Sequence, residues 1–137
     1  MKKNNQKIYI LDTSAILSGK NPDFADNFIT ATGVSNELTP GGKDYQLFQF
    51  LKEKGLKVFS PSKEKIEKVI EFAKKTGDIG RLSDTDIEIL ALALEIKDKK
   101  EKKPVLVTDD YSIQNLANFM NILYLSLSQK GIKKSFK

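Results

Sequence analysis

Six acidic residues stand where the sequence changes from one predicted element to the next. They follow strand-like runs or open a predicted helix, and they are Asp12, Glu37, Asp84, Asp86, Asp109 and Asp110. In a parallel sheet the carboxyl ends of the strands lie along one edge, so acids that are far apart in the sequence can converge there. Converging carboxylates repel one another unless a cation lies between them. Because the chain has no histidine and no cysteine, the cluster favours a hard divalent cation, and we predict Mg²⁺ or Mn²⁺.

A cation held in this way suits the hydrolysis of a phosphodiester. It can activate water, orient the phosphodiester and neutralise charge that develops on its oxygens. Each acid also has a structural explanation, because Asp12 and the 109–110 pair could cap the helices that follow them. Ser83 and Asp86 have the S-x-x-D spacing of a capping box, and Glu37 could simply be exposed. An acid at every strand-to-helix junction on one side of the sheet, with another at the start of the buried helix, nevertheless favours a metal site over separate structural roles.

The hydrophobic pattern predicts the elements that must position these acids. Apolar, β-prone runs predict strands at 8–11, 56–61, 104–107 and 122–127, and β-branched residues predict extended structure from 27 to Glu37. Helices are predicted after Asp12 and at 47–54, 62–76, 82–96 and 111–120. This alternation predicts an α/β, three-layer fold with a central, mainly parallel β-sheet flanked by helices. Residues 1–137 are predicted to form a single domain, with flexible ends at 1–6 and 135–137.

The two longest predicted helices should pack differently. In 62–76 the apolar residues form one stripe and Lys and Glu occupy the other face, which is typical of an amphipathic surface helix that ends near Gly77. In 82–96 apolar residues cover most of the circumference, which predicts a largely buried helix. The lysine-rich stretch 97–103 is predicted to be a solvated connector.

Composition limits the class of protein. The net charge is +5, and lysine supplies all but one of the 23 basic residues, the exception being Arg81. This balance suits a polyanionic partner such as RNA, although a lysine-rich surface also serves solubility. On charge alone, Arg81 and Lys103 are candidate RNA-binding residues. The lack of a long apolar run and of a signal-peptide pattern predicts a cytoplasmic protein without a membrane partner.

The acidic motifs, in their order along the chain, resemble those of a known family. D-T-S after an apolar strand, the glutamate of VSNEL, LSDTDIEILALALE and VLVTDD look like the motifs of PIN-domain ribonucleases. More narrowly, FSPSKEKIEKVIEFAKKTGDIGRLSDTDIEILALALE followed by VLVTDDYSIQNLA resembles the archaeal Nin-one-binding (Nob) endonucleases, which mature the 3′ end of small-subunit ribosomal RNA. The resemblance covers residues 7–134.

The resemblance implies roles for individual residues. The catalytic, metal-binding cluster would comprise Asp12, Glu37, Asp86 and either Asp109 or Asp110. For the fourth ligand, the T-x-D spacing from Thr108 favours Asp110. Asp109 is favoured instead by its position directly after the strand, so both remain candidates. Ser14 would orient a ligand carboxylate or bound water. Thr108 and Asp84 would support the ligands from just outside them, and Asp84 would also suit a capping role.

The same resemblance implies an endoribonuclease that cleaves precursor small-subunit rRNA. Metal-activated water would attack phosphorus in line and leave a 3′-hydroxyl and a 5′-phosphate. The partners would be this RNA and the pre-ribosomal particle, and a homodimer remains an option. Family members usually continue after a GIKK segment into a zinc ribbon with paired cysteines, and this sequence ends at GIKKSFK. RNA affinity and substrate choice are therefore less well specified than the catalytic chemistry.

Other classes of protein use similar residues differently. A VapC-like toxin ribonuclease would share the acidic chemistry, pair with an antitoxin and cut tRNA or other cellular RNA. A non-catalytic RNA-binding PIN scaffold would keep the fold without turnover. Phosphoreceiver domains have paired acids near the first strand, and haloacid-dehalogenase-like phosphatases have a second aspartate two residues after the first. Here Asp12 has no acidic neighbour and Ser14 occupies the second position, which disfavours both.

Overall fold

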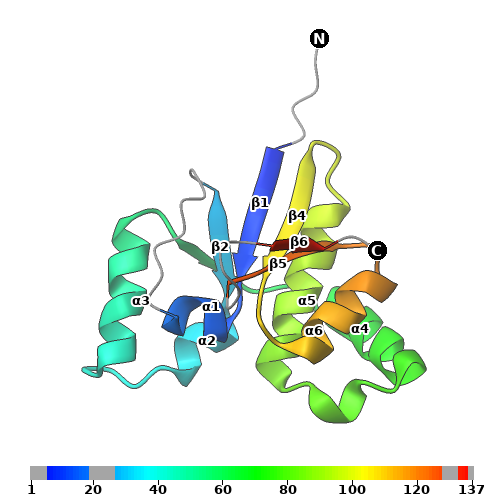
Figure 1. Cartoon of the computed structure of the whole chain (residues 1–137), viewed down its shortest axis with the longest axis horizontal. Helices are drawn as coiled ribbons and strands as arrows, with labels where there is room; N and C mark the ends of the chain where they lie inside the picture. Colours follow the sequence, from blue (N-terminus) through cyan, green and yellow to red (C-terminus); the bar gives the residue numbers. More distant parts are fainter. Residues whose placement is uncertain (1–5, 19–26, 128–132, 136–137) are drawn as a thin grey trace.

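A six-stranded sheet forms the middle layer of the fold (Figure 1). The computed structural model describes residues 6–18, 27–127 and 133–135, the last range as backbone only. The strands are β1 (Gln6–Leu11), β2 (Phe28–Ala31), β3 (Lys57–Phe59), β4 (Lys102–Val107), β5 (Leu123–Ser126) and β6 (Lys133–Ser135). Their order is β3-β2-β1-β4-β5-β6, and all neighbours are parallel except β6, which runs antiparallel to β5. The predicted α/β fold with a mainly parallel sheet is confirmed.

Helices cover both faces of this sheet. They are α1 (Thr13–Leu17), α2 (Thr32–Glu37), α3 (Lys43–Glu53), α4 (Lys63–Thr76), a 3₁₀ turn (Ile79–Arg81), α5 (Asp84–Lys97) and α6 (Tyr111–Phe119). Figure 1 shows α1 and α3 on one side of the sheet and α4, α5 and α6 on the other, as right-handed crossovers require. Among the described residues, no helix has the length and apolar character needed to cross a membrane.

The ends of α4 follow from the residues at its two termini. Ser62 Oγ accepts a hydrogen bond from Lys65 N at 3.2 Å, which satisfies one of the free amides of the first turn. Gly77 ends the helix with φ of 84°, where a side chain would be strained. Val69 and Ala73 are buried and α4 packs against α5. The predicted amphipathic surface helix is therefore confirmed.

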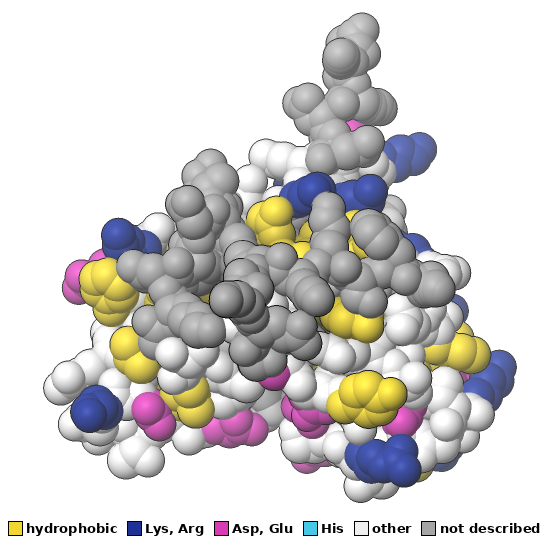
Figure 2. Space-filling model, viewed as in Figure 1, with side chains coloured by type: hydrophobic (Ala, Val, Ile, Leu, Met, Phe, Trp, Pro, Cys, Tyr) yellow, Lys and Arg dark blue, Asp and Glu magenta, His cyan; other side chains and the backbone are white. Residues whose placement is uncertain are grey.

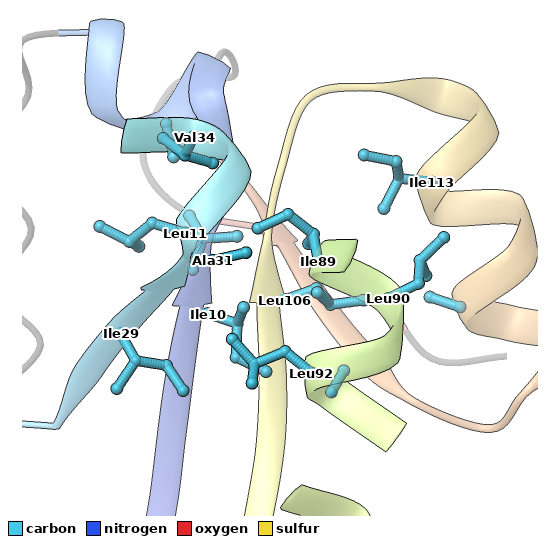
Figure 3. Close-up of a cluster of buried hydrophobic side chains, with 14 of the residues drawn as sticks. Ile10, Leu11, Ile29, Ala31, Val34, Ile89, Leu90, Leu92, Leu106 and Ile113 are labelled. Atoms are coloured by element: carbon cyan, nitrogen blue, oxygen red, sulfur yellow. The ribbon is translucent and has the colours of Figure 1, made fainter. Parts of the chain in front are cut away.

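α5 lies at the centre of the hydrophobic core. Figure 3 shows buried side chains of α5 packed against those of β1 and β4, namely Ile89, Leu90, Leu92, Ile10 and Leu106. Burying each such side chain stabilises the fold by about 1.5–3 kcal/mol. The prediction of a largely buried helix is confirmed, and this packing fixes the first turn of α5 at the carboxyl edge of the sheet.

The segment from 27 to Glu37 departs from the sequence prediction. The β-branched residues predict extended structure, but β2 ends at Ala31 and the chain continues as α2. Strand preference is strongly dependent on context, and tertiary contacts decide the conformation here. Gly33 N donates a hydrogen bond to Glu88 Oε1 at 2.8 Å, which holds α2 against α5. Glu37 therefore ends a helix and does not follow an extended segment.

Two other differences lie in the C-terminal half. Lys102 and Lys103 belong to β4, and α5 continues to Lys97, so the connector is shorter than the predicted 97–103. The sequence reading did not predict β6, which pairs with β5. Of the predicted flexible ends, Gln6 and Ser135 lie in strands, and the rest fall outside the described residues.

Asp78 lies between α4 and the 3₁₀ turn and links both of them to α6. It is 3% exposed, and its Oδ2 accepts hydrogen bonds from Thr76 Oγ1 at 2.7 Å and Asn115 Nδ2 at 2.8 Å. Its Oδ1 accepts from Arg81 Nη1 at 3.2 Å. Burial alone would raise the pKa of Asp78, but these hydrogen bonds and the charge of Arg81 outweigh it and lower the pKa. The carboxylate thus ties the end of α4 and the 3₁₀ turn to α6.

We expect Asp78→Ala to lower the free energy of unfolding by about 2 kcal/mol at neutral pH. A carboxyl with a lowered pKa stabilises the fold above its unfolded pKa, and this contribution is lost as pH falls through the folded pKa. In urea unfolding, the difference between wild type and variant should therefore shrink below about pH 4. Glu67→Ala, at an exposed position of α4, is the control. An equal loss at neutral and acidic pH would contradict this role of the carboxylate.

Candidate active site

Asp12 is the first residue after β1 and is 4% exposed. Its Oδ1 accepts hydrogen bonds from Ser14 Oγ at 2.8 Å and Ala15 N at 2.9 Å, and its Oδ2 accepts one from Thr108 Oγ1. Asp12 therefore caps α1 and is also linked to the end of β4. A carboxylate has about four lone-pair directions, so these bonds leave room for one further ligand.

The hydroxyl of Thr108 connects Asp12 to the start of α6. Thr108 follows β4 and is 1% exposed, and its Oγ1 also accepts from Asp110 N at 3.0 Å. Asp110 caps α6, because its Oδ1 accepts from Ser112 N at 2.8 Å and Ile113 N at 3.2 Å. Since β1 and β4 are adjacent and parallel, their carboxyl ends bring Asp12 and Asp110 to the same edge of the sheet.

Asp109 is directed toward another strand. Its Oδ1 accepts hydrogen bonds from Ser126 Oγ at 2.6 Å and Leu127 N at 2.9 Å, both at the end of β5. These bonds join the β4–α6 connection to β5. Of the two candidates for the last ligand, Asp110 has the position that faces the other acids.

Asp86 lies in the first turn of α5 and is half-buried. Its Oδ2 accepts from Ser83 N at 2.9 Å, and its own N donates to Ser83 Oγ at 3.1 Å, which completes the capping box. The structural explanation is therefore correct for this residue. A capping role and a ligand role are compatible, because the cap uses only part of the lone-pair capacity of the carboxylate.

Glu37 reaches the cluster from the end of α2. Its Oε1 accepts from Thr13 Oγ1 at 3.0 Å, and Thr13 opens the helix that Asp12 caps. The Gly33–Glu88 hydrogen bond holds α2 on α5. Glu37 itself is exposed, and it is positioned by its hydrogen bond to α1 and by the attachment of its own helix to α5.

The charges of four acids are coupled through Asp86. Burial is the main cause that raises the pKa of Asp86, and the negative charges of Asp110 and Glu37 raise it further, against the hydrogen bonds of the capping box. Burial also raises the pKa of Asp12, and the charge of Asp86 adds to this shift, although three hydrogen bonds oppose it. Figure 2 shows acidic side chains gathered along the lower edge of the molecule, where the strands end. The structure thus brings together Asp12, Glu37, Asp86 and Asp110.

The chemistry of this donor set fits Mg²⁺ or Mn²⁺. The donors are carboxylate oxygens, with the hydroxyls of Ser14 and Thr108 bonded to one of them, and hard cations prefer such oxygen ligands. In the part of the chain that the structure describes, no three acidic side chains are grouped closely enough to hold one ion as they stand. Each carboxylate accepts hydrogen bonds at a nearby helix terminus instead, so metal binding would require the side chains to move.

The remaining predicted site residues lie around or away from the four acids. Ser14 and Thr108 contact Asp12 directly, as described above. Asp84 is exposed in the first turn of α5. Arg81 binds Asp78. Lys103 lies beside Lys7 near the amino ends of β4 and β1, so the structure does not bring it together with the acids.

Comparison with known families identifies the fold. The family model described as the PIN domain of ribonuclease matches residues 9–96. The chain belongs to the PIN-domain ribonuclease family. The match includes Asp12, Glu37 and Asp86, so three of the four grouped acids lie within the shared part of this PIN domain.

Individual relatives agree with this assignment. Endoribonuclease Nob1 of Archaeoglobus fulgidus is 39% identical over 131 residues, which is 96% of this chain and 75% of the relative. Ribonuclease VapC1 of Thermoplasma acidophilum is 38% identical over 127 residues, 93% of this chain and 61% of the relative. The 20S-pre-rRNA D-site endonuclease nob1 of Schizosaccharomyces pombe is 37% identical over 94 residues, 64% of this chain and 23% of the relative. This PIN domain is therefore Nob1-like and also similar to VapC proteins.

Sequence reasoning missed two residues that position the acids of this PIN domain. Thr13 supports Glu37, and its place next to Asp12 is a signal that could have been used. Glu88 supports α2 and stands one helical turn after Asp84. Its role depends on α2 being a helix, which the local pattern did not reveal.

Gly33→Ala should disturb the position of Glu37. A Cβ at Gly33 would lie 2.8 Å from Thr85 Oγ1 and 2.9 Å from Glu88 Oε1, so these side chains would have to move and the Gly33–Glu88 hydrogen bond would be disturbed. We expect a loss of about 1–3 kcal/mol of unfolding free energy, measured in urea, together with slower RNA cleavage. Gly80→Ala is the control, because a Cβ there meets open space and should be neutral or stabilising. Equal stability of the two variants would argue against close packing of α2 on α5.

Proposed function

We propose that this PIN domain is a divalent-metal-dependent endoribonuclease that cleaves precursor small-subunit ribosomal RNA at its 3′ end. The meeting of Asp12 and Asp110 at the hydroxyl of Thr108, beyond the paired carboxyl ends of β1 and β4, carries the proposal, and Glu37 is joined to the same edge through Thr13. In the described residues, the ion pairs are Lys65–Asp98 and Arg81–Asp78, and neither involves these four acids. A gathered set of acids without a basic partner is well suited to bind a cation.

The metal would be held by Asp12, Glu37, Asp86 and Asp110. When bound, it would supply a Lewis acid that activates water and neutralises charge on the phosphate oxygens. The chain's own groups orient the ligands. The hydroxyls of Ser14 and Thr108 fix the Asp12 carboxylate. Hydrogen bonds of this kind hold ligands in the orientation that metal binding needs.

The substrate assignment rests on the relatives and on the sequence resemblance. The archaeal relatives are named endoribonucleases, and the name of the fission-yeast relative specifies a precursor rRNA. We therefore propose the same class of RNA, cut within a pre-ribosomal particle in the cytoplasm. The basic net charge of +5 supports an RNA partner, while self-association as a homodimer stays a prediction.

The test uses a short RNA that spans the 3′ end of the small-subunit rRNA precursor. The protein is incubated with this RNA and Mn²⁺, Mg²⁺ or a chelator, and the product ends are mapped. Cleavage at the mature end that requires the metal and leaves a 3′-hydroxyl and a 5′-phosphate is expected. Cleavage that persists in chelator would contradict metal dependence, and RNA binding without any cleavage would favour the scaffold.

Two aspartates on α5 offer a matched pair for this assay. We expect Asp86→Asn to slow metal-dependent cleavage at least about a hundredfold, because it removes a negative charge from the centre of the coupled acids. The asparagine oxygen can still accept from Ser83 N, so the start of α5 should be kept. Asp84→Asn makes the same chemical change at an exposed position two residues away and should leave cleavage near the wild-type rate. Similar losses in both variants would indicate a general charge effect.

The similarity to VapC1 supports a second candidate, a toxin ribonuclease. The same assay with tRNA as substrate separates the two functions. Preferential cleavage of tRNA over the rRNA precursor, together with a small antitoxin gene beside this gene, would favour the toxin. The acids would have the same roles in either case.

A further inference from the structure

One face of the sheet is open beside β3. The helix α5 packs on β4, β1 and β2, and β3 is the edge strand beyond them. Lys57 of β3 pairs in register with Ile29 of β2, and alternation along the strand places Phe59 on the same face as Lys57. Ile29 is 8% exposed, whereas Phe59 is 46% exposed. The edge strand therefore presents an aromatic ring and a lysine beside the part of the face that α5 does not cover.

A cavity of about 470 Å³ lies between this open face and the C-terminal half of α5. Its apolar wall is formed by Ile8, Phe28, Ile29, Leu92 and Ile96. Phe59 stands at the exposed side of the cavity. The volume lies in the range of about 300–1,000 Å³ that is usual for small-ligand sites.

The mouth of the cavity is basic. Three exposed lysines line it, namely Lys57, Lys99 and Lys102. Glu95 is the acid in the lining, and its Oε1 already accepts a hydrogen bond from Ser62 N at 3.1 Å. In the described part of the chain the ion pairs lie elsewhere and leave these lysines without an acidic partner.

The basic charge continues along the amino edge of the sheet. Lys7 of β1 and Lys103 of β4 are neighbours in register there, one residue beyond Lys102. Figure 2 shows Lys and Arg side chains at the upper end of the molecule, and others near the corners of its lower edge. Lys103, which the sequence suggested as an RNA contact, therefore belongs to this basic edge and not to the acidic one.

We propose that the cavity binds a base of single-stranded RNA, with the neighbouring phosphates on Lys57, Lys99 and Lys102. The proposal rests on the proposed ribonuclease function and adds a second RNA site to it, remote from the acids. An exposed aromatic ring stacks on any base, and lysines neutralise the flanking phosphates. An acidic peptide would also satisfy the lysines, but the flat face of Phe59 next to an apolar wall favours a base.

Binding is measured without cleavage, in chelator, by fluorescence anisotropy of the full chain with a labelled single-stranded RNA. The triple variant Lys57→Ala/Lys99→Ala/Lys102→Ala should bind at least about tenfold more weakly. Its slope of log affinity against log salt should be smaller by about 2, since each single-strand contact contributes about 0.7. The control is Lys63→Ala/Lys68→Ala/Lys75→Ala, which removes equal charge from exposed positions of α4 and should weaken binding less.

A second variant tests whether the cavity binds the RNA base, separately from the contacts of the lysines with phosphates. Phe59→Ala should weaken binding about 5- to 100-fold, and Phe59→Tyr should restore it. An RNA of equal length with abasic positions should bind wild type more weakly and should be insensitive to Phe59→Ala. Thermal melting of each variant confirms that it is folded.

Three results would overturn the proposal. They are equal losses in the two lysine triples, equal binding of abasic and normal RNA to wild type, and polyglutamate that binds more tightly than RNA and depends on the same residues. If wild type still cuts RNA with metal in any of these cases, the proposed function stands and the second site fails. If wild type neither binds nor cuts RNA, both proposals fail together.

Discussion

Asp12→Asn is expected to slow metal-dependent RNA cleavage at least about a thousandfold. The substitution removes the negative charge from a carboxylate that is 4% exposed and is coupled to Asp86. The shape of the side chain is kept, because the asparagine oxygen can accept from Ser14 and Ala15. Its amide group can donate to the Thr108 hydroxyl, which rotates to accept. Single-turnover cleavage of the precursor RNA in Mn²⁺ measures the effect.

Stability distinguishes loss of catalysis from loss of structure in this variant. The raised pKa of Asp12 means that the folded state binds a proton more readily than the unfolded chain. The ionised carboxylate therefore lowers stability, and this penalty is fully present above the raised pKa. Stability recovers as pH falls through the raised pKa to the ordinary value of an aspartate. Asp12→Asn should melt at or above the wild-type Tm without metal, and Mg²⁺ should raise the wild-type Tm more than that of the variant. A variant that is inactive and melts well below wild type would instead attribute the lost activity to lost structure and not to a missing metal ligand.

Substitution of the two adjacent aspartates after β4 should affect RNA cleavage differently. We expect Asp110→Asn to slow cleavage at least about a hundredfold, because its charge contributes to the field at Asp86. Asparagine is as good a helix cap as aspartate, so α6 should still begin at the same residue. Asp109→Asn should cut at close to the wild-type rate, since its carboxylate binds the end of β5.

The same RNA and metal concentrations are used for both variants, with circular dichroism to show that each is folded. The affinity for Mn²⁺, measured by titration of the cleavage rate, should fall in Asp110→Asn and stay unchanged in Asp109→Asn. The reverse result would place Asp109 among the ligands and would mean that its bonds to β5 break when metal binds.

Much of the scaffold was predictable because it depends on local patterns. The caps at Ser62, Ser83 and Gly77 and the apolar surface of 82–96 specify two helices directly. The acids at the strand ends could be found for the same reason, since the parallel arrangement of β1 and β4 brings their carboxyl ends together.

The features that the sequence did not predict depend on contacts between residues that are far apart in the chain. The helix α2 is held by Glu88, which lies 55 residues from Gly33 in the sequence. Asp109 and Asp110 likewise point in different directions because Asp109 bonds to β5 and Asp110 bonds to Thr108. The spacing of residues in the sequence does not reveal these contacts. Sequence alone therefore located the acidic edge but could not say which member of the pair faces it.

The full-length pairing of β1 with β4 has an electrostatic consequence. The register runs from Gln6 beside Lys102 to Leu11 beside Val107, with lysines near one end and Asp12 directly beyond the other. Six residues at about 3.3 Å each make this strand pair about 20 Å long, more than twice the screening length of about 8 Å at physiological ionic strength. In such a solution, the charges at one end of the strand pair therefore have little effect on the electrostatic potential at the other end. A polyanion can be attracted to one end while the other keeps an uncompensated cluster of negative charge.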